Sequence, residues 1–223
     1  VADFCAGLYA AYTITAMLMQ TRQTGEGAYI DCSMLGALIG VAALQTSEYF
    51  GTGKSGPRLG SAHPRNAPYQ AFKAKDDYFI IAAGNDALWR QVAEAVGLPD
   101  LPSDPRFTTQ LDRARNQKEL AAILEERFAT RTAREWLEEM DRRGVPCAPI
   151  NSYAEILSDP HVKSMGLVLP LTLPNGVETR TTAFPIGISG FNFEIRHPPP
   201  ELGAHTQEVI SEWLDAEETK VAG

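Results

Sequence analysis

The stretch GSAHPRNAPYQAFKAKDDYFIIAAGN, residues 60–85, decides most of what the sequence predicts. A loop of small and polar residues, 60–68, runs into two apolar segments, Tyr69–Ala74 and Tyr78–Ala83, which a Lys-Asp-Asp turn connects. Apolar segments on either side of a polar turn predict a β-hairpin. A small polar loop held by a hairpin can lie close to a reactive group and present backbone N–H groups to it. A plain surface connection between two domains is the simpler alternative, and the loop alone favours it.

Size and charge narrow the classes of protein. The chain has 223 residues, of which 44% are hydrophobic, and a formal net charge of −8. This length allows one large or two small packed domains. We predict no nucleic-acid partner, because no block of lysine and arginine is available to neutralise phosphates. The three cysteines lie far apart and predict buried free thiols, and the four scattered histidines predict no metal site.

The first fifty residues predict two helices with a strand between them. Phe4–Arg22 is the most apolar stretch, and the following Thr-Gly-Glu-Gly supplies a C-cap and a turn. No basic region precedes this stretch, and it is barely long enough to span a bilayer, so we predict a helix buried in protein and no membrane partner. Ala28–Ser33 predicts a short strand, and Met34–Phe50 a second helix.

Breaker residues divide the rest of the chain. Gly51–Pro68 contains four glycines and three prolines and predicts a linker. Beyond the hairpin we predict helices over Asp86–Val96, Arg113–Ala129 and Thr132–Arg143, an extended Val145–Asn151, and a short helix ending at Leu157. Capping boxes at Thr132 and Ser152 open the last two helices. We also predict a second hairpin, Leu167–Leu173 with Val177–Ala183, and a helix over His205–Leu214 followed by a frayed tail. Trp89, Phe128 and Trp136 are predicted to lie in the core.

Asp3 is the first candidate for chemistry. A carboxylate just before an apolar helix most often caps that helix by accepting hydrogen bonds from free backbone N–H groups. A partly desolvated carboxylate at a helix start can instead attack a thioester as a nucleophile. The physics of the sequence leaves both roles open.

The segment VADFCAGLYAAYTITAMLMQTRQTGEGAYIDCSML, residues 1–35, resembles the part of class III (formyl-CoA/carnitine type) CoA-transferases that carries their catalytic aspartate. Asp3 and Gly7, Thr24-Gly25 with Gly27, and Asp31 match that pattern. The resemblance makes Asp3 the nucleophile and gives Asp31 a structural place. It also implies that the loop at 60–68 covers the covalent aspartyl intermediate and contacts the CoA thioester. The site residues so predicted are Gly60, Ser61, Ala62, His63, Arg65, Asn66 and Tyr69.

The resemblance continues along nearly the whole chain, through PYQAF at 68–72, DPRF at 104–107 and GVPCAPI at 144–150. HPRNAPYQAF and GVPCAPIN are closest to the branch of succinyl-CoA-dependent dicarboxylate CoA-transferases. The family also has a nucleotide-binding-type α/β half before the aspartate, and these 223 residues resemble only the C-terminal half. We therefore expect the apolar helix to pack on material outside this chain, and the isolated chain to be a poor catalyst.

The resemblance implies an α/β fold made of part of the family's large domain and a small α/β domain with a hairpin and helices. Residues 1–50 would be the large-domain segment carrying the nucleophile, 51–68 the linker loop, 69–157 the small domain, and 158–223 the return to the large domain. An acyl-CoA and a carboxylic acid would be the substrates, with no permanently bound cofactor. We expect a homodimer in the cytoplasm, or in the mitochondrial matrix of a eukaryote.

Two other functions stay open. Acyl-CoA racemases of the same fold use the matching aspartate as a base, together with a histidine and a glutamate. By resemblance that glutamate falls at Asn85, which cannot carry a proton, so transfer of CoA is favoured. The third possibility is an inactive, truncated chain that folds and dimerises without turnover.

Overall fold

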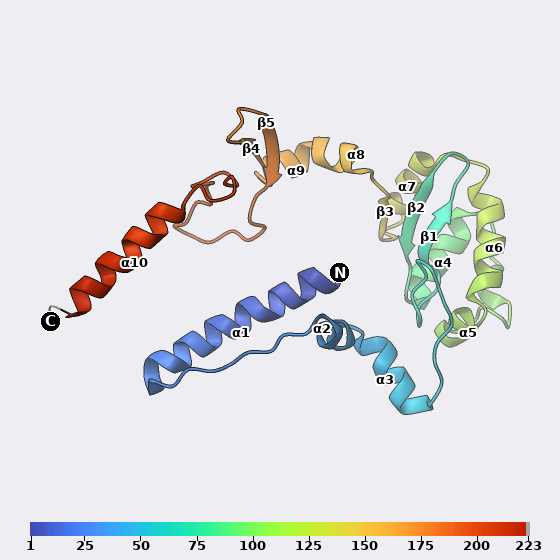
Figure 1. Ribbon diagram of the computed structural model, residues 1–223. Helices are drawn as coiled ribbons and strands as arrows, with labels where there is room; N and C mark the ends of the chain where they lie inside the picture. Colours follow the sequence, from blue (N-terminus) through green and yellow to red (C-terminus); the bar gives the residue numbers. More distant parts are fainter. Residues whose placement is uncertain (222–223) are drawn as a thin grey trace. The chain divides into compact units, whose positions relative to one another are not determined.

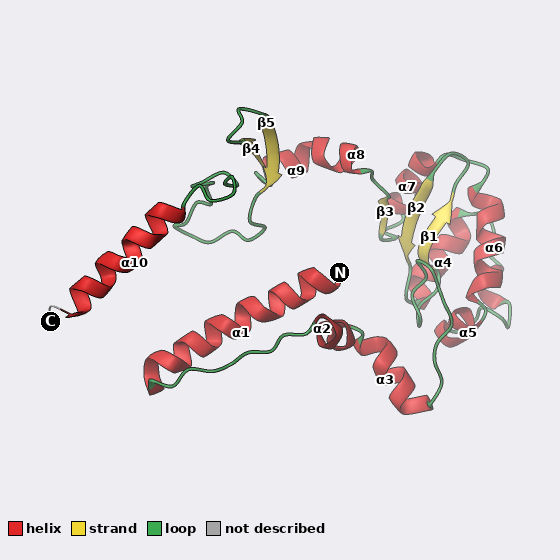
Figure 2. Cartoon of the chain, in the orientation of Figure 1, coloured by secondary structure: helices red, strands yellow, loops and turns green. Residues whose placement is uncertain are grey.

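The computed structural model describes the backbone of residues 1–221 and the side chains of residues 1–214 (Figure 1). The chain separates into two compact units, Val1–Pro149 and the residues from Ile150 onward. Helices and small antiparallel sheets make a mixed α/β fold, as predicted (Figure 2). The domain boundaries at residues 50, 68 and 157 stay predictions.

Three helices open the chain: α1 (Ala2–Thr24), α2 (Met34–Val41) and α3 (Ala43–Thr52). Gly25 ends α1 in the left-handed conformation, with φ at 75°, as the Thr-Gly-Glu-Gly turn predicted. The strand predicted over residues 28–33 is wrong: this segment is irregular. A strand needs a neighbour to accept its backbone hydrogen bonds, and none of the paired strands in the described part of the chain lies beside it.

Helix α1 differs from the prediction in its environment. We predicted a buried helix, yet no residue of α1 is buried, and Phe4, Leu8 and Leu18 are 81%, 69% and 57% exposed. Among the helices and strands that the structure describes, α2 is the one that packs closely along it, so most of its apolar surface stays uncovered. By length and composition α1 could cross a membrane, a criterion that core helices of soluble proteins also meet.

The small α/β part contains a three-stranded antiparallel sheet in the order β1 (Tyr69–Lys73), β2 (Tyr78–Ala82), β3 (Cys147–Pro149). The first two strands form the predicted hairpin, with Phe72 opposite Phe79. Helices α4 (Asp86–Ala95), α5 (Gln110–Arg115), α6 (Gln117–Phe128) and α7 (Ala133–Arg142) follow the hairpin, with a 3-10 turn, η1 (Leu101–Ser103), after α4.

The core of this part is built around one aromatic ring. The ring of Phe128 lies edge-on to Phe72, Phe79 and Trp136, at centroid distances of 5.2, 5.0 and 5.2 Å. Edge-on aromatic pairs contribute roughly 0.5–1.5 kcal/mol each beyond the area they bury. The indole N–H of Trp136 donates to the carbonyl oxygen of Phe128 at 2.9 Å. Trp89 is also buried, so the three aromatic core predictions are confirmed.

Local capping fixes several helix ends. Thr132 and Glu135 form the predicted capping box of α7, and Ser152 and Glu155 form that of α8 (Tyr153–Ser158). The single helix predicted over residues 113–129 is two helices, because the backbone at Asn116 leaves the helical region with φ at −105° and ψ at 21°.

The second unit contains α8, α9 (Pro160–Ser164), the predicted hairpin of β4 (Val168–Thr172) with β5 (Glu178–Thr182), and α10 (Thr206–Val221). Helix α10 continues past Leu214, so the tail predicted to fray from residue 215 is helical as far as Val221. The last two residues of that predicted tail, 222 and 223, lie outside the described residues.

Cys5, Cys32 and Cys147 are free thiols, as predicted, but they are partly exposed rather than buried.

Candidate active site

The loop of residues 60–68, here called the covering loop, folds back along the outer edge of β1. The hydroxyl oxygen of Ser61 accepts a hydrogen bond from the N–H of Ala71 at 3.1 Å. Two residues further, the N–H of His63 donates to the carbonyl oxygen of Tyr69 at 2.9 Å. The Glu125 carboxylate of α6 accepts from the N–H of Lys73 at 3.3 Å, where the covering loop no longer reaches. The loop is therefore held in register with the first strand.

His63 organises the turn inside the covering loop. Its Nδ1 accepts hydrogen bonds from the backbone N–H groups of Arg65 and Asn66, both at 3.1 Å. The imidazole stacks on the ring of Tyr69, with centroids 5.1 Å apart and an angle of 18° between the planes. The side chain that we predicted to contact substrate therefore also determines the shape of its own loop.

The C-terminal end of the covering loop is fixed by a buried cation. Arg113 of α5 is fully buried, and its guanidinium donates to the carbonyl oxygens of Ala67 at 2.8 Å and Phe107 at 3.2 Å. Its Nη2 also pairs with the Asp86 carboxylate at the start of α4, at 2.7 Å. The Arg113 side chain of α5 thus connects the end of the covering loop to the start of α4.

Asn66 joins the loop to α5 in a second way. Its amide oxygen accepts a hydrogen bond from the Gln110 side chain. Gly84, after β2, lies so close that a Cβ there would be 3.4 Å from the Asn66 side chain. The sequence did not point to Gln110 or to Gly84, since both contacts join residues far apart in the chain.

The structure brings the predicted loop residues together. Gly60, Ser61, Arg65 and Tyr69 are exposed, while Ala62, His63 and Asn66 are partly buried. The Arg65 guanidinium reaches the carbonyl oxygen of Leu44 in α3 at 3.4 Å, which links the loop to the preceding helix. The loop thus presents a histidine, a guanidinium and an aromatic ring within a few residues.

Asp3, the predicted nucleophile, makes no described hydrogen bond or ion pair with the residues of the covering loop. It is exposed in the first turn of α1, so the partial desolvation expected for a nucleophile is not seen. The capping role is also wrong, because Val1 is the N-cap residue and no side chain caps the helix. Within the described part of the chain, no hydrogen bond or ion pair joins Asp3 to the covering loop. The rival carboxylate, Asp31, is exposed in the irregular segment before α2.

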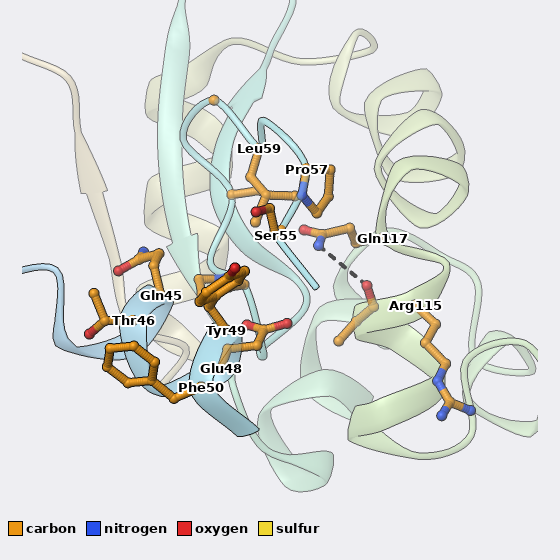
Figure 3. A pocket seen from close by; sticks show the side chains of 15 residues that line it. Gln45, Thr46, Glu48, Tyr49, Phe50, Ser55, Pro57, Leu59, Arg115 and Gln117 are labelled. Atoms are coloured by element: carbon orange, nitrogen blue, oxygen red, sulfur yellow. Dashed lines mark hydrogen bonds between the residues drawn. The ribbon is translucent and has the colours of Figure 1, made fainter. Parts of the chain in front are cut away.

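A pocket of about 760 Å³ has the covering loop as one wall (Figure 3). Gly60 and Ala62 line it together with Tyr49 of α3 and Arg115 of α5. The Gln117 side chain extends into this region from α6; its Nε2 donates to the carbonyl oxygen of Ala114 at 3.3 Å, and its buried Oε1 has no partner among the described residues. No group of three metal-binding side chains occurs in the residues that the structure describes.

The comparisons with known proteins agree with this architecture. The model of CoA-transferase family III matches residues 1–206, and the chain belongs to this family. Succinyl-CoA:glutarate CoA-transferase of Mus musculus is 35% identical over 216 residues, which are 97% of this chain and 50% of that protein. Succinate–glutarate CoA-transferase of Agrobacterium fabrum is 32% identical over 219 residues, 98% of this chain and 55% of that protein. The chain thus spans about half the length of these relatives.

A solved structure shows the same fold. The crystal structure of a CaiB/BaiF family protein from Brucella suis superposes with a TM-score of 0.75 at 36% identity. The similarity covers 95% of this chain and 55% of that one. Both comparisons therefore extend over α1, the covering loop and the small α/β part together.

Proposed function

We propose that the protein transfers coenzyme A from succinyl-CoA to a dicarboxylic acid such as glutarate. The observation that carries this proposal is the similarity, along 97% of the chain, to the succinyl-CoA:glutarate CoA-transferase of Mus musculus. Because the chain spans about half of that relative, the proposal concerns the protein expressed from the whole reading frame.

Asp3 is proposed as the nucleophile of a covalent route. A carboxylate oxygen of Asp3 attacks the thioester carbonyl of succinyl-CoA, which forms a mixed anhydride and releases the CoA thiolate. The thiolate then attacks the aspartyl carbonyl, giving an aspartyl-CoA thioester and free succinate. The acceptor carboxylate reverses these two steps: it forms a new anhydride with Asp3, and the thiolate attacks the acceptor carbonyl to give the product thioester and free Asp3.

The covering loop has a chemical purpose in this route. Anhydrides and thioesters react with water, so a site that holds them must exclude solvent. The loop is short, built from small residues, and fixed by contacts from Ser61, His63 and Ala67. A loop fixed in this way keeps its shape when it lies over a reacting group, and its backbone N–H groups can face developing negative charge.

The test replaces Asp3 with Asn in the protein expressed from the whole reading frame. We expect the rate of CoA transfer to fall by roughly three orders of magnitude or more, because a covalent intermediate is lost. Asp31→Asn is the matched control, a neighbouring carboxylate that should leave most of the rate. Hydroxylamine trapping followed by peptide mapping identifies the acylated residue. An adduct on any carboxylate other than Asp3 would overturn the assignment.

The environment of Asn85 supports transfer over racemisation. Its Oδ1 accepts a hydrogen bond from the N–H of Leu88 at 2.9 Å and so caps α4. An amide in this position can neither donate nor remove a proton in acid–base catalysis. Assays in deuterated water distinguish the two reactions, since a racemase would place deuterium on the α-carbon without exchanging CoA.

We also propose that the protein acts as a homodimer. The exposed apolar side chains of α1 support this, because a soluble protein rarely leaves so much apolar surface uncovered. Sedimentation of the protein at micromolar concentration tests it, and a monomer would contradict it.

A further inference from the structure

The hydrogen bonds of His63 determine where its proton lies. Nδ1 accepts from two backbone N–H groups, those of Arg65 and Asn66. A ring nitrogen that accepts hydrogen bonds carries no proton, and in the neutral imidazole the proton is then on the other nitrogen, Nε2. The loop backbone therefore selects, for the neutral ring, the tautomer with its proton on Nε2.

The same surroundings fix the direction of the Nε2–H group. The ring stacks on Tyr69 at 5.1 Å, and the backbone of His63 is tied to Tyr69 by a hydrogen bond of 2.9 Å. A half-turn flip of the ring would break both Nδ1 contacts, and a smaller rotation would also disturb the stacking. In the part of the chain that the structure describes, no oxygen accepts a hydrogen bond from Nε2. A fixed donor is thus left without a partner on a partly exposed side chain.

We propose that the Nε2–H of His63 binds a carboxylate oxygen of the acid substrate as a neutral donor. This inference rests on the proposed function, in which a carboxylate attacks the aspartyl thioester. A neutral N–H group can hold that carboxylate without cancelling its charge, so the attacking oxygen keeps its basicity. The guanidinium of Arg65, on the same turn, donates to Leu44 and is therefore turned toward α3.

Two substitutions separate the substrate contact from the structural contact. In His63→Asn, the side-chain Oδ1 can take the place of Nδ1 and accept from the two N–H groups, but no atom replaces Nε2. In His63→Gln, the longer amide can place an N–H near the position of Nε2, while the acceptor at Nδ1 is lost. His161→Asn, an exposed histidine of α9, is the control. All variants are made in the protein expressed from the whole reading frame.

Steady-state kinetics with succinyl-CoA and glutarate give the first readout. We expect His63→Asn to keep the thermal stability of the wild type and to raise KM for glutarate by about 10- to 100-fold, the effect of losing a hydrogen bond to a charged group. KM for succinyl-CoA should change much less. His63→Gln should lower the melting temperature but raise KM for glutarate less than His63→Asn does. The reverse order of the two KM values would overturn the proposal, because it would show that only the Nδ1 contacts matter.

Histidine-selective ¹⁵N NMR gives a second readout that needs no turnover. The missing signal in His63→Asn assigns the residue, and long-range ¹H–¹⁵N correlations report which ring nitrogen carries the proton. We expect the Nε2–H form, and a shift of Nε2 when glutarate is added but not when the neutral glutaramide is added. A proton on Nδ1, or an Nε2 chemical shift that does not change when glutarate is added, would refute the inference. If glutarate shifts Nε2 in a protein that shows no CoA transfer, the inference stands and the proposed function fails.

Discussion

Replacing Arg113 with Met tests whether one buried cation holds the covering loop to the small α/β part. The substitution leaves two buried carbonyl oxygens, those of Ala67 and Phe107, without donors. A buried acceptor left without its partner costs about 1–3 kcal/mol. The pair with Asp86 adds little, roughly 0–1 kcal/mol, because that carboxylate side chain is 55% exposed. Methionine fills much of the volume, so we expect the free energy of unfolding to fall by about 4 kcal/mol.

Urea unfolding followed by tryptophan fluorescence measures this loss. Trp89 and Trp136 are buried in the same core, and Arg113 lies 5.9 Å from the ring of Trp89. Trp213, which is 72% exposed, is first changed to Phe so that, of the three tryptophans in these 223 residues, the two core indoles remain. Arg115→Met, two residues along and exposed, is the matched control and should change the free energy by less than about 0.5 kcal/mol. Arg113→Lys keeps the charge and can reach one carbonyl. Its loss of unfolding free energy should lie between those of Arg113→Met and Arg115→Met.

A loss below about 1 kcal/mol for Arg113→Met would show that water replaces the guanidinium at the two carbonyls, and the reasoning would be wrong. Equal losses for Arg113→Met and Arg115→Met would show that the effect belongs to helix α5 as a whole rather than to the buried contacts.

Two further predictions concern local interactions. Thr132→Ala removes the hydroxyl that accepts from the N–H of Glu135, so the free energy of unfolding should fall by about 0.5–2 kcal/mol in the same urea experiment, and an unchanged midpoint would contradict the capping box. Hydrogen bonds from the Arg106 guanidinium hold the pKa of Asp104 well below its usual 3.8, at about 2. This lowered pKa stabilises the fold above about pH 4, and the contribution is lost as the pH falls through 2. Carboxyl ¹³C titration should give a midpoint near 2, moving toward 3.8 in Arg106→Gln.

Features that depend on a few neighbouring residues were predicted from the sequence. The two hairpins and both capping boxes have their signals within about fifteen residues, so the chain needs no distant partner to form them. The prediction of a strand over residues 28–33 was wrong. A β-strand needs a second strand to pair with, and the alternation of residues within one segment does not show whether that partner exists. The apolar composition of α1 predicted burial, yet composition does not say whether the covering surface belongs to the same chain.

The candidate site was predicted as a segment rather than as a set of contacts. The loop residues came from the family resemblance, and their roles toward substrate stay predictions. What the sequence could not supply were the anchors: Gln110 and Arg113 reach the loop from positions 44 and 46 residues away, and Asp86 pairs with Arg113.

The covering loop also has a consequence for solubility. In the sheet order β1-β2-β3, the first strand is an edge, and its outward N–H groups could pair with a strand from another molecule. Side-chain oxygens of Ser61 and Glu125 accept hydrogen bonds from two of those N–H groups. The N–H of His63 donates to the carbonyl oxygen of Tyr69 on the same edge. The segment proposed to cover the reacting group therefore also protects the sheet from strand-to-strand association. We expect loop variants that release this edge to aggregate more readily than the parent, however well their chemistry works.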